Sequence, residues 1–155
     1  MDIKKVVVIG SGTMGSGIAA QVANAGIPVF LLDLPSNEGP RNKIVENAKE
    51  RIVNSRPPLL VEKSKIDLIS AGNIEDDFNL VGEADWVVEA VVERIDIKHS
   101  IYKKIEDVRK SQSVISSNTS TIPLKVLSEN MSDEMKQNFC ITHFFNPVRY
   151  TGLLE

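Results

Sequence analysis

Short apolar runs rich in β-branched residues alternate along this chain with stretches whose apolar residues recur at helical spacing. Residues 6–9 form one such run, and continuous apolarity is typical of a parallel strand that is buried on both faces. Residues 14–25 have helical spacing and end at Gly26-Ile27-Pro28, after which residues 29–33 form a second apolar run. This order predicts a strand–helix–strand unit with parallel strands and a right-handed crossover.

The alternation continues through the rest of the chain. Strands at residues 73–74, 86–91, 113–117 and 139–144 are predicted, with a long helix at residues 96–109 and a short one at residues 123–127. Strands that alternate with helices are typical of the α/β class. We therefore expect a Rossmann-type, doubly wound and mainly parallel sheet in one domain that spans residues 1–155.

Residues 35–73 interrupt this pattern, because they are rich in Lys, Arg, Glu and Asn and contain four prolines. An amphipathic helix is predicted at residues 41–53, with Ile44, Ala48 and Ile52 on its apolar stripe, and a second short helix at residues 61–70. We interpret the segment as a helical arm that projects from the core. An ordinary crossover helix with long loops fits the same pattern equally well.

The formal net charge of −3 gives no general electrostatic reason to bind nucleic acid or an anionic membrane. The single cysteine, Cys140, excludes a disulfide framework and a cysteine metal cluster within the chain, and no metal site is expected. Its apolar neighbours Phe139 and Ile141 predict a buried thiol. No apolar run approaches the ~18 residues of a membrane span, and the N-terminus has no signal-peptide pattern, so a cytoplasmic location is expected.

The loop Gly10-Ser11-Gly12-Thr13-Met14-Gly15 joins the first predicted strand to the first predicted helix. Gly10 permits the tight turn, Gly12 lets the backbone approach a pyrophosphate, and Gly15 lets the helix pack closely on the strand. The helix N-terminus offers free N–H groups and a partial positive charge to the phosphates. Asp33 ends the next strand, where its carboxylate can accept hydrogen bonds from ribose hydroxyls and would repel a 2′-phosphate. This context predicts a dinucleotide site that prefers NAD over NADP.

Polar residues also follow two later strands. Ser117-Asn118-Thr119-Ser120 ends one strand, and His143 ends another, with Asn146 three residues further on. Ligands bind at the carboxyl edge of a doubly wound sheet, and imidazole is a suitable general base near neutral pH. The residues alone leave two other interpretations open: the serine cluster as a turn or helix cap, and His143 as a satisfied core residue. His99 lies on the polar side of a lysine-rich helix and is expected to be solvated.

The chain resembles the 3-hydroxyacyl-CoA dehydrogenase family in four blocks that occur in the family's order along essentially the whole chain. In the family a helical second domain follows, closes the acyl site and forms much of the dimer interface. We therefore expect this chain to retain NAD binding, to lose most acyl-CoA turnover and to be a possible homo-oligomer. The four blocks are Val8-Ile9-Gly10-Ser11-Gly12-Thr13-Met14-Gly15, Val87-Val88-Glu89-Ala90-Val91-Val92-Glu93, Ser117-Asn118-Thr119-Ser120 and His143-Phe144-Phe145-Asn146-Pro147-Val148.

The resemblance implies NAD as the cofactor and an acyl-CoA as the substrate partner. It assigns the adenosine half of NAD to the loop from Gly10 to Gly15 and to Asp33. The nicotinamide half is assigned to Glu93, Lys98 and Asn146. In the family the segment after the second strand contacts CoA, but this segment departs from the family pattern, and none of its basic residues is assigned.

The resemblance also implies an enzyme that oxidises the 3-hydroxyl of an acyl-CoA to a ketone in fatty-acid β-oxidation. Ser120 matches the serine that contacts both substrate hydroxyl and cofactor, and His143 matches the catalytic base. Glu155, twelve residues after His143, matches the glutamate that fixes the imidazole tautomer. Two other functions stay open: a non-catalytic NAD-binding module, and a Rossmann dehydrogenase for a small hydroxy acid, against which the last two blocks argue.

Overall fold

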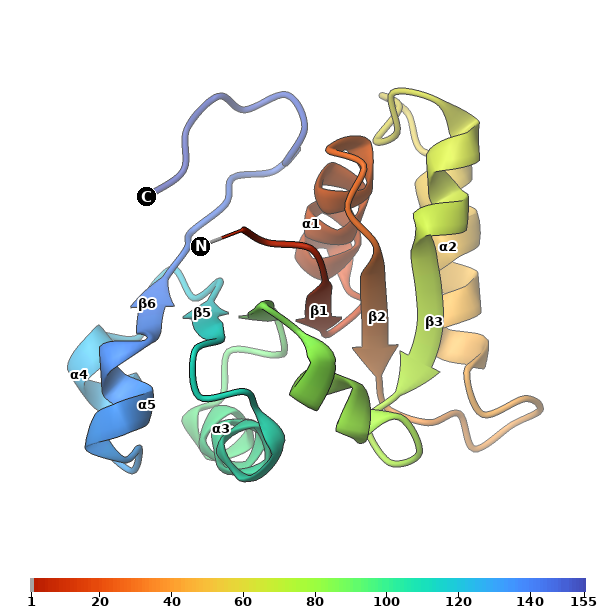
Figure 1. Cartoon of the computed structure of the whole chain (residues 1–155). Helices are drawn as coiled ribbons and strands as arrows, with labels where there is room; N and C mark the ends of the chain where they lie inside the picture. Colours follow the sequence, from red (N-terminus) through yellow and green to blue (C-terminus); the bar gives the residue numbers. More distant parts are fainter. Residues whose placement is uncertain (1) are drawn as a thin grey trace.

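The computed structural model describes residues 2–155, which form a six-stranded sheet with helices on both faces (Figure 1). All neighbouring strands are parallel, in the order β3-β2-β1-β4-β5-β6, so the chain crosses the sheet between β3 and β4. The expected Rossmann-type, doubly wound fold is confirmed. The strands are β1 (Val6–Ile9), β2 (Val29–Asp33), β3 (Ile69–Asn73), β4 (Trp86–Glu89), β5 (Val114–Ser117) and β6 (Phe139–Ile141).

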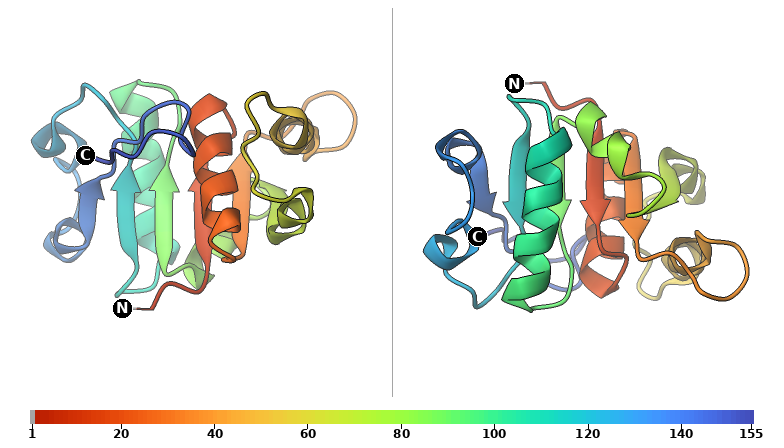
Figure 2. Two further views of the ribbon diagram at one scale, coloured as in Figure 1. Left: turned by 90° about the horizontal axis from the view of Figure 1, so that it is seen from above. Right: turned by 90° about the horizontal axis from the view of Figure 1, so that it is seen from below.

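The helices divide between the two faces of the sheet (Figure 2). One face packs against α1 (Thr13–Asn24) and α2 (Lys43–Asn54). The other packs against α3 (Ile95–Val108), α4 (Leu124–Leu127) and α5 (Asp133–Gln137). Two 3₁₀ helices, η1 (Lys63–Leu68) and η2 (Phe78–Glu83), lead into β3 and β4.

The apolar run of β1 is continuous because helices cover it on both sides. Val6 and Val8 belong to the core on the α1 side, whereas Val7 and Ile9 belong to the core on the α3 side. Alternate side chains of a strand point to opposite faces, so a strand between two helical layers needs an apolar residue at every position. Burial of each such side chain contributes roughly 1.5–3 kcal/mol.

Two glycines bring α1 against the end of β1. Gly10 has a φ of 102°, and a Cβ there would lie 2.5 Å from the carbonyl oxygen of Ala90. A Cβ on Gly15 would lie only 1.8 Å from the carbonyl oxygen of Gly10. A side chain at Gly15 would therefore push the helix away from the strand end, and one at Gly10 would push the turn away from the backbone that follows β4.

The helical segment after β2 is present, but it packs on the sheet instead of projecting from it. Val45, Ala48 and Ile52 of α2 are at most 1% exposed and lie in the core against α1 and the sheet. Of the two interpretations, the crossover helix describes α2. Val45, and not the half-buried Ile44, completes the buried stripe.

Two further predictions in this segment were wrong in their bounds. The short helix predicted at residues 61–70 is the 3₁₀ helix η1, and the arm does not extend to residue 73 because Ile69–Asn73 pair with β2. The strand predicted at residues 73–74 is therefore β3, which begins earlier. Its sequence Ile-Ser-Ala-Gly-Asn has no continuous apolar run, so pairing with β2 and not local pattern defines it.

The expectation that Cys140 is buried was also wrong. In β6 the neighbouring Phe139 turns inward, with its ring 5.2 Å from that of Tyr102. Cys140 points to the opposite face and is exposed, because β6 is an edge strand of the sheet. Partial burial nevertheless raises the pKa of its thiol above the usual value.

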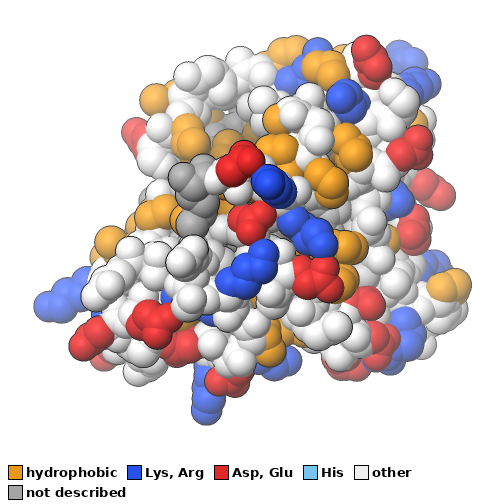
Figure 3. Space-filling view, viewed as in Figure 1, with side chains coloured by type: hydrophobic (Ala, Val, Ile, Leu, Met, Phe, Trp, Pro, Cys, Tyr) orange, Lys and Arg blue, Asp and Glu red, His pale blue; other side chains and the backbone are white. Residues whose placement is uncertain are grey.

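Acidic and basic side chains are intermixed on the face drawn in Figure 3. Ion pairs near the surface of the molecule include Lys5–Glu83 at 2.6 Å and Lys110–Asp85 at 3.0 Å. Within residues 2–155, no helix has the length and apolarity needed to cross a membrane. Over the same range no group of three His, Cys, Asp or Glu side chains is arranged to hold a metal ion.

Gly15→Ala should lower the free energy of unfolding by at least about 2 kcal/mol, because its Cβ would overlap the Gly10 carbonyl. Gly152→Ala is the matched control, since no described atom lies within 4 Å of the position of its Cβ. Urea denaturation of both variants measures the difference. Equal stabilities would contradict the close approach of α1 to β1.

Candidate functional site

The carboxyl edge of the sheet brings the predicted site residues around one cavity of about 390 Å³. The glycine-rich loop contributes Met14 from one side, and Glu93 follows β4. Ser120 follows β5, and His143 and Asn146 follow β6. Four segments that are distant in sequence thus meet where ligands bind in doubly wound folds. The other lining residues are Ala90, Val91, Asn118, Phe144 and Phe145.

Gly12 differs from its two neighbours in the glycine-rich loop. No described atom lies within 4 Å of the position that its Cβ would occupy, and its φ of −65° suits any residue. Packing within the residues that the structure describes therefore does not require glycine here. Gly12 is the N-cap of α1, and no described side chain caps that helix, so the first N–H groups of Thr13 and its neighbours face the open space.

Asp33 lies directly beside this loop. Its Oδ2 accepts hydrogen bonds from both the backbone N–H and the hydroxyl of Ser11, each at 2.6 Å. Its Oδ1 accepts from the N–H of Leu34 at 2.7 Å. The predicted Ser11 and Asp33 are thus in contact, and Oδ1, which accepts from this one described donor, can accept a further hydrogen bond.

Glu89, at the end of β4, is a functional candidate that the sequence analysis missed. Its carboxylate is fully buried and accepts from Lys98 Nζ at 2.7 Å, Tyr102 Oη at 2.6 Å and Ser117 Oγ at 2.6 Å. A backbone N–H from Val91 completes the set at 2.8 Å. A single carboxylate inside the apolar run Val87-Val88-Glu89-Ala90 was the sequence signal, because a buried charge needs partners.

The phenol of Tyr102 remains a hydrogen-bond donor to Glu89. Burial, and then the negative charge of Glu89, raise the pKa of the Tyr102 hydroxyl far above its usual range. The network therefore holds its protons in fixed places: the ammonium and two hydroxyls donate, and the carboxylate accepts.

Lys98 and Glu93 lie together, but they differ in access to the cavity. Lys98 is 1% exposed, and its ammonium is shared between Glu89 and Glu93, the latter at 3.2 Å. Glu93 lines the cavity and also accepts hydrogen bonds from Thr119 and Thr121. Burial alone would raise the pKa of Glu93, but the Thr119 hydrogen bond and the charge of Lys98 outweigh it, so the pKa is below its usual value.

The serine cluster after β5 has divided roles. Ser117 is buried and donates a hydrogen bond to Glu89, whereas Ser120 is exposed and lines the cavity. Asn118 connects the two neighbouring segments: its N–H donates to the Glu89 carbonyl at 2.8 Å, and its Oδ1 accepts from the Phe144 N–H at 2.9 Å. The cluster thus forms a turn at the cavity, and Asn118 links the end of β4 to the residues after β6.

His143 and Glu155 form a close pair beside the cavity. Nδ1 of His143 lies 3.3 Å from Oε2 of Glu155. Their backbones pair as well, through His143 N–H to Glu155 O at 2.8 Å and Glu155 N–H to His143 O at 3.2 Å. The His143 ring is 4.4 Å from the ring of Phe145, which limits its rotation. Because the carboxylate only accepts, the ring proton is on Nδ1 and Nε2 is left as a base.

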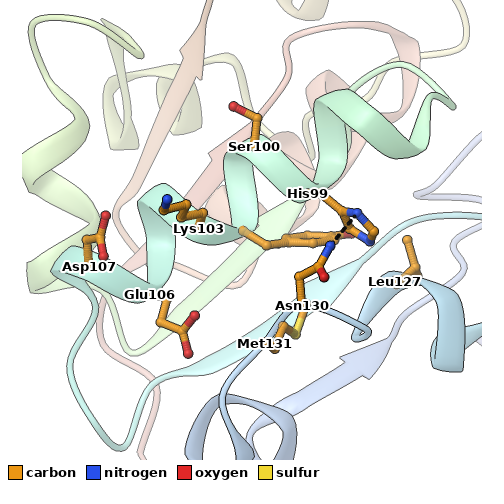
Figure 4. A pocket seen from close by; sticks show the side chains of 9 residues that line it. His99, Ser100, Lys103, Glu106, Asp107, Leu127, Asn130 and Met131 are labelled. Atoms are coloured by element: carbon orange, nitrogen blue, oxygen red, sulfur yellow. Dashed lines mark hydrogen bonds between the residues drawn. The ribbon is translucent and has the colours of Figure 1, made fainter.

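A second and larger cavity, of about 580 Å³, lies between α3 and α4 and away from the predicted residues (Figure 4). His99 lines it but is not simply solvated, as was expected. Its Nε2 contacts the carbonyl oxygen of Val126 at 2.9 Å, and its Nδ1 contacts Asn130 Nδ2 at 3.1 Å. Both ring nitrogens therefore connect α3 to α4 and the turn after it.

Known proteins match both the sequence and the fold. The family model described as 3-hydroxyacyl-CoA dehydrogenase, NAD binding domain, matches residues 5–155. A putative fatty acid oxidation complex trifunctional enzyme of Rickettsia felis is 50% identical over 155 residues, which cover 99% of this chain and 22% of the relative. A probable 3-hydroxyacyl-CoA dehydrogenase of Deinococcus radiodurans is 46% identical over 156 residues, covering 100% of this chain and 45% of the relative.

A solved structure of 3-hydroxybutyryl-CoA dehydrogenase from Escherichia coli has the same fold, with a TM-score of 0.82 and 28% identity. The match covers 99% of this chain and 32% of that one. This chain thus spans between about a fifth and just under half of the length of the curated relatives named above.

Glu89→Gln should lower the free energy of unfolding by about 3–5 kcal/mol, because it leaves the buried Lys98 ammonium without its main partner. Glu83→Gln removes a solvent-screened ion pair with Lys5 and should have a much smaller effect. Urea denaturation at neutral pH compares the two. A similar small effect for both would show that Glu89 does not hold the edge of the sheet together.

The lowered pKa of Glu93 predicts a pH dependence. An acid whose pKa is lower in the folded state stabilises the fold above its unfolded pKa, and this contribution disappears as the pH falls through the folded value. Wild-type melting temperature should therefore fall more steeply than that of Glu93→Gln below about pH 4.5. If the melting temperatures of wild type and Glu93→Gln fall equally as the pH decreases, the result would count against the Glu93 contacts.

Proposed function

The chain belongs to the family of 3-hydroxyacyl-CoA dehydrogenase NAD-binding domains, and we propose that it supplies the cofactor site and the catalytic base for oxidation of a 3-hydroxyacyl-CoA to the 3-ketoacyl-CoA. One observation carries this proposal. Met14 of the glycine-rich loop and His143, the candidate base, line the same cavity, although 129 residues separate them (143 minus 14). Cofactor and substrate would therefore meet beside an imidazole.

The residues at the adenosine end fit NAD. The open space at Gly12 accommodates a diphosphate close to the first N–H groups of α1. Oδ1 of Asp33 has a lone pair for a ribose hydroxyl, and its negative charge opposes a 2′-phosphate. Leu34 and Val92 are 60% and 61% exposed after β2 and β4, the two strands that flank β1. Such apolar side chains suit the faces of an adenine base.

At the other end of the cavity, Glu93 and Asn146 offer polar groups to the nicotinamide half. Glu93 is oriented by Thr119 and Thr121, and Lys98 acts through Glu93 because its own ammonium is buried. This differs from direct contact between Lys98 and the cofactor. When bound, the nicotinamide ring supplies the acceptor for hydride from C3 of the substrate.

The proposed chemistry of the chain's own residues is proton transfer. His143 Nε2 takes the proton of the 3-hydroxyl as the C3 hydride leaves. Glu155 holds the proton on Nδ1 and stabilises the imidazolium that forms, as a carboxylate does in other histidine–acid pairs. Ser120, exposed on the same cavity, orients the hydroxyl by hydrogen bonding.

NADH should bind the chain, and Gly12→Val should weaken binding by at least roughly 100-fold without unfolding, because its side chain fills the diphosphate space. NADPH should bind more weakly than NADH because of Asp33. Calorimetric titration measures all three affinities, and circular dichroism controls for folding. NADPH bound as tightly as NADH would refute the role of Asp33, and unchanged affinity in Gly12→Val would refute that of the loop.

His143→Ala should reduce the rate of acetoacetyl-CoA reduction by NADH by about 10²–10⁴-fold while NADH affinity stays unchanged. Glu155→Gln should have a smaller effect in the same direction, because the base is retained but its partner is weakened. The decrease in NADH absorbance measures the rate. NADH binding by the wild-type chain without any turnover would instead support a domain that binds NAD and is not catalytic.

A further inference from the structure

The residues between His143 and Glu155 form a closed loop, and we refer to residues 144–154 as the return loop. Its two ends pair as antiparallel strands through the reciprocal His143–Glu155 backbone bonds and the bridge between Phe144 and Leu154. The distance between His143 Nδ1 and Glu155 Oε2 therefore depends on how this loop is held.

The two halves of the return loop, residues 144–149 that lead away from His143 and residues 150–154 that lead back to Glu155, are held very differently. Val148 is 6% exposed and packs on α1, where a Cβ on Gly17 would come within 2.9 Å of its Cγ2. In contrast, Leu153 and Leu154 are about half exposed, and the Glu155 side chain is 62% exposed. Burial contributes little to the position of Glu155, which is therefore held by its backbone pairing with His143 and by the anchors of the loop.

The tip of the return loop is bound to the segment between α2 and η1. Arg149 Nη1 donates to the carbonyl oxygens of Pro58 at 2.8 Å and of Leu60 at 2.9 Å. The hydroxyl of Tyr150 donates to the same Pro58 oxygen at 2.7 Å. The Arg149 guanidinium also lies over the Tyr150 ring, 5.2 Å from its centre.

The segment that receives these bonds is itself firmly attached to the core. Asn24, the last residue of α1, donates through Nδ2 to the Leu59 carbonyl at 2.8 Å and accepts from the Val61 N–H at 2.9 Å. Leu60 is buried in the core on the α1 side. Arg149 therefore connects the return loop to a fixed point and not to a second loose loop.

We propose that Arg149 is a positioning residue for the His143–Glu155 pair, a role that rests on the proposed function of that pair. One guanidinium nitrogen makes both bonds to the 58–60 segment. Loss of this nitrogen leaves the tip of the return loop with only the Tyr150 hydroxyl bond to Pro58, and residues 150–154 are then held less firmly in the geometry that sets Glu155 against His143. Lysine, whose ammonium has three donors on one nitrogen, can replace both bonds.

The ring tautomer of His143 reports directly on this geometry. With Glu155 as acceptor, the proton is on Nδ1. His99 is an internal reference with the opposite ring tautomer, because its Nε2 faces a carbonyl oxygen and must carry the proton. These are the two histidines of the chain, so only two sets of ¹⁵N ring signals have to be told apart, and a His99→Ala variant assigns them.

The test compares wild type, Arg149→Met and Arg149→Lys by ¹⁵N ring shifts at about pH 8, where imidazole is neutral, and by amide hydrogen exchange. In Arg149→Met, the His143 signal should move toward the Nε2–H tautomer, while His99 stays unchanged. Exchange of the His143 and Glu155 amides should accelerate by roughly tenfold or more, with β1 amides unaffected.

Two further variants are controls. Arg149→Lys should behave as wild type. Arg56→Met, at an exposed arginine near the same segment, should change neither readout.

Three results would overturn the proposal: a wild-type tautomer and exchange in Arg149→Met, acceleration that extends equally to β1, or an Arg149→Lys variant as defective as Arg149→Met. None of these readouts requires cofactor or substrate. Failure of the proposed function has a different signature, which is acetoacetyl-CoA reduction by NADH that survives His143→Ala.

Discussion

The buried ion pair between Glu89 and Lys98 organises the half of the sheet edge where the chemistry is proposed. Glu89 is held by groups from the turn after β4, from α3 and from β5, so one carboxylate fixes the mutual position of three elements. Two buried charges are costly unless each has its full set of partners. Here the Lys98 ammonium and the Tyr102 and Ser117 hydroxyls all have carboxylate acceptors, and the pair specifies one arrangement of the strand ends.

Contacts lead outward from this pair to both candidate catalytic regions. Lys98 extends to Glu93, which lines the cavity. The Glu89 carbonyl accepts from Asn118, whose side chain accepts from the residue after His143. On the other half of the edge, the constraint is steric: the turn at Gly10 lies against the carbonyl of Ala90, immediately after Glu89. The polar network and the glycine turn therefore meet at the end of β4.

Local spacing was enough to predict the parts of the fold and site that local physics determines. The strand–glycine loop–helix–Asp33 unit follows from sterics and helix electrostatics within about 30 residues. Partners distant in sequence were not predictable in this way. Glu89 depends on donors from two other elements, β3 is defined by its pairing with β2, and exposure of Cys140 follows from the edge position of β6. Arg149 meets carbonyls 91 and 89 residues earlier in the chain, which no local pattern encodes.

NAD is proposed to bind at the carboxyl edge of the sheet and not in the larger cavity between α3 and α4. Titration of ¹⁵N-labelled chain with NADH, followed by amide chemical shifts, tests it most directly. We expect the largest shifts at Gly12 to Gly15, Leu34, Glu93 and Asn146, with His99 and Asn130 unaffected. Shifts concentrated at His99 and Asn130, with the glycine-rich loop unchanged, would contradict it.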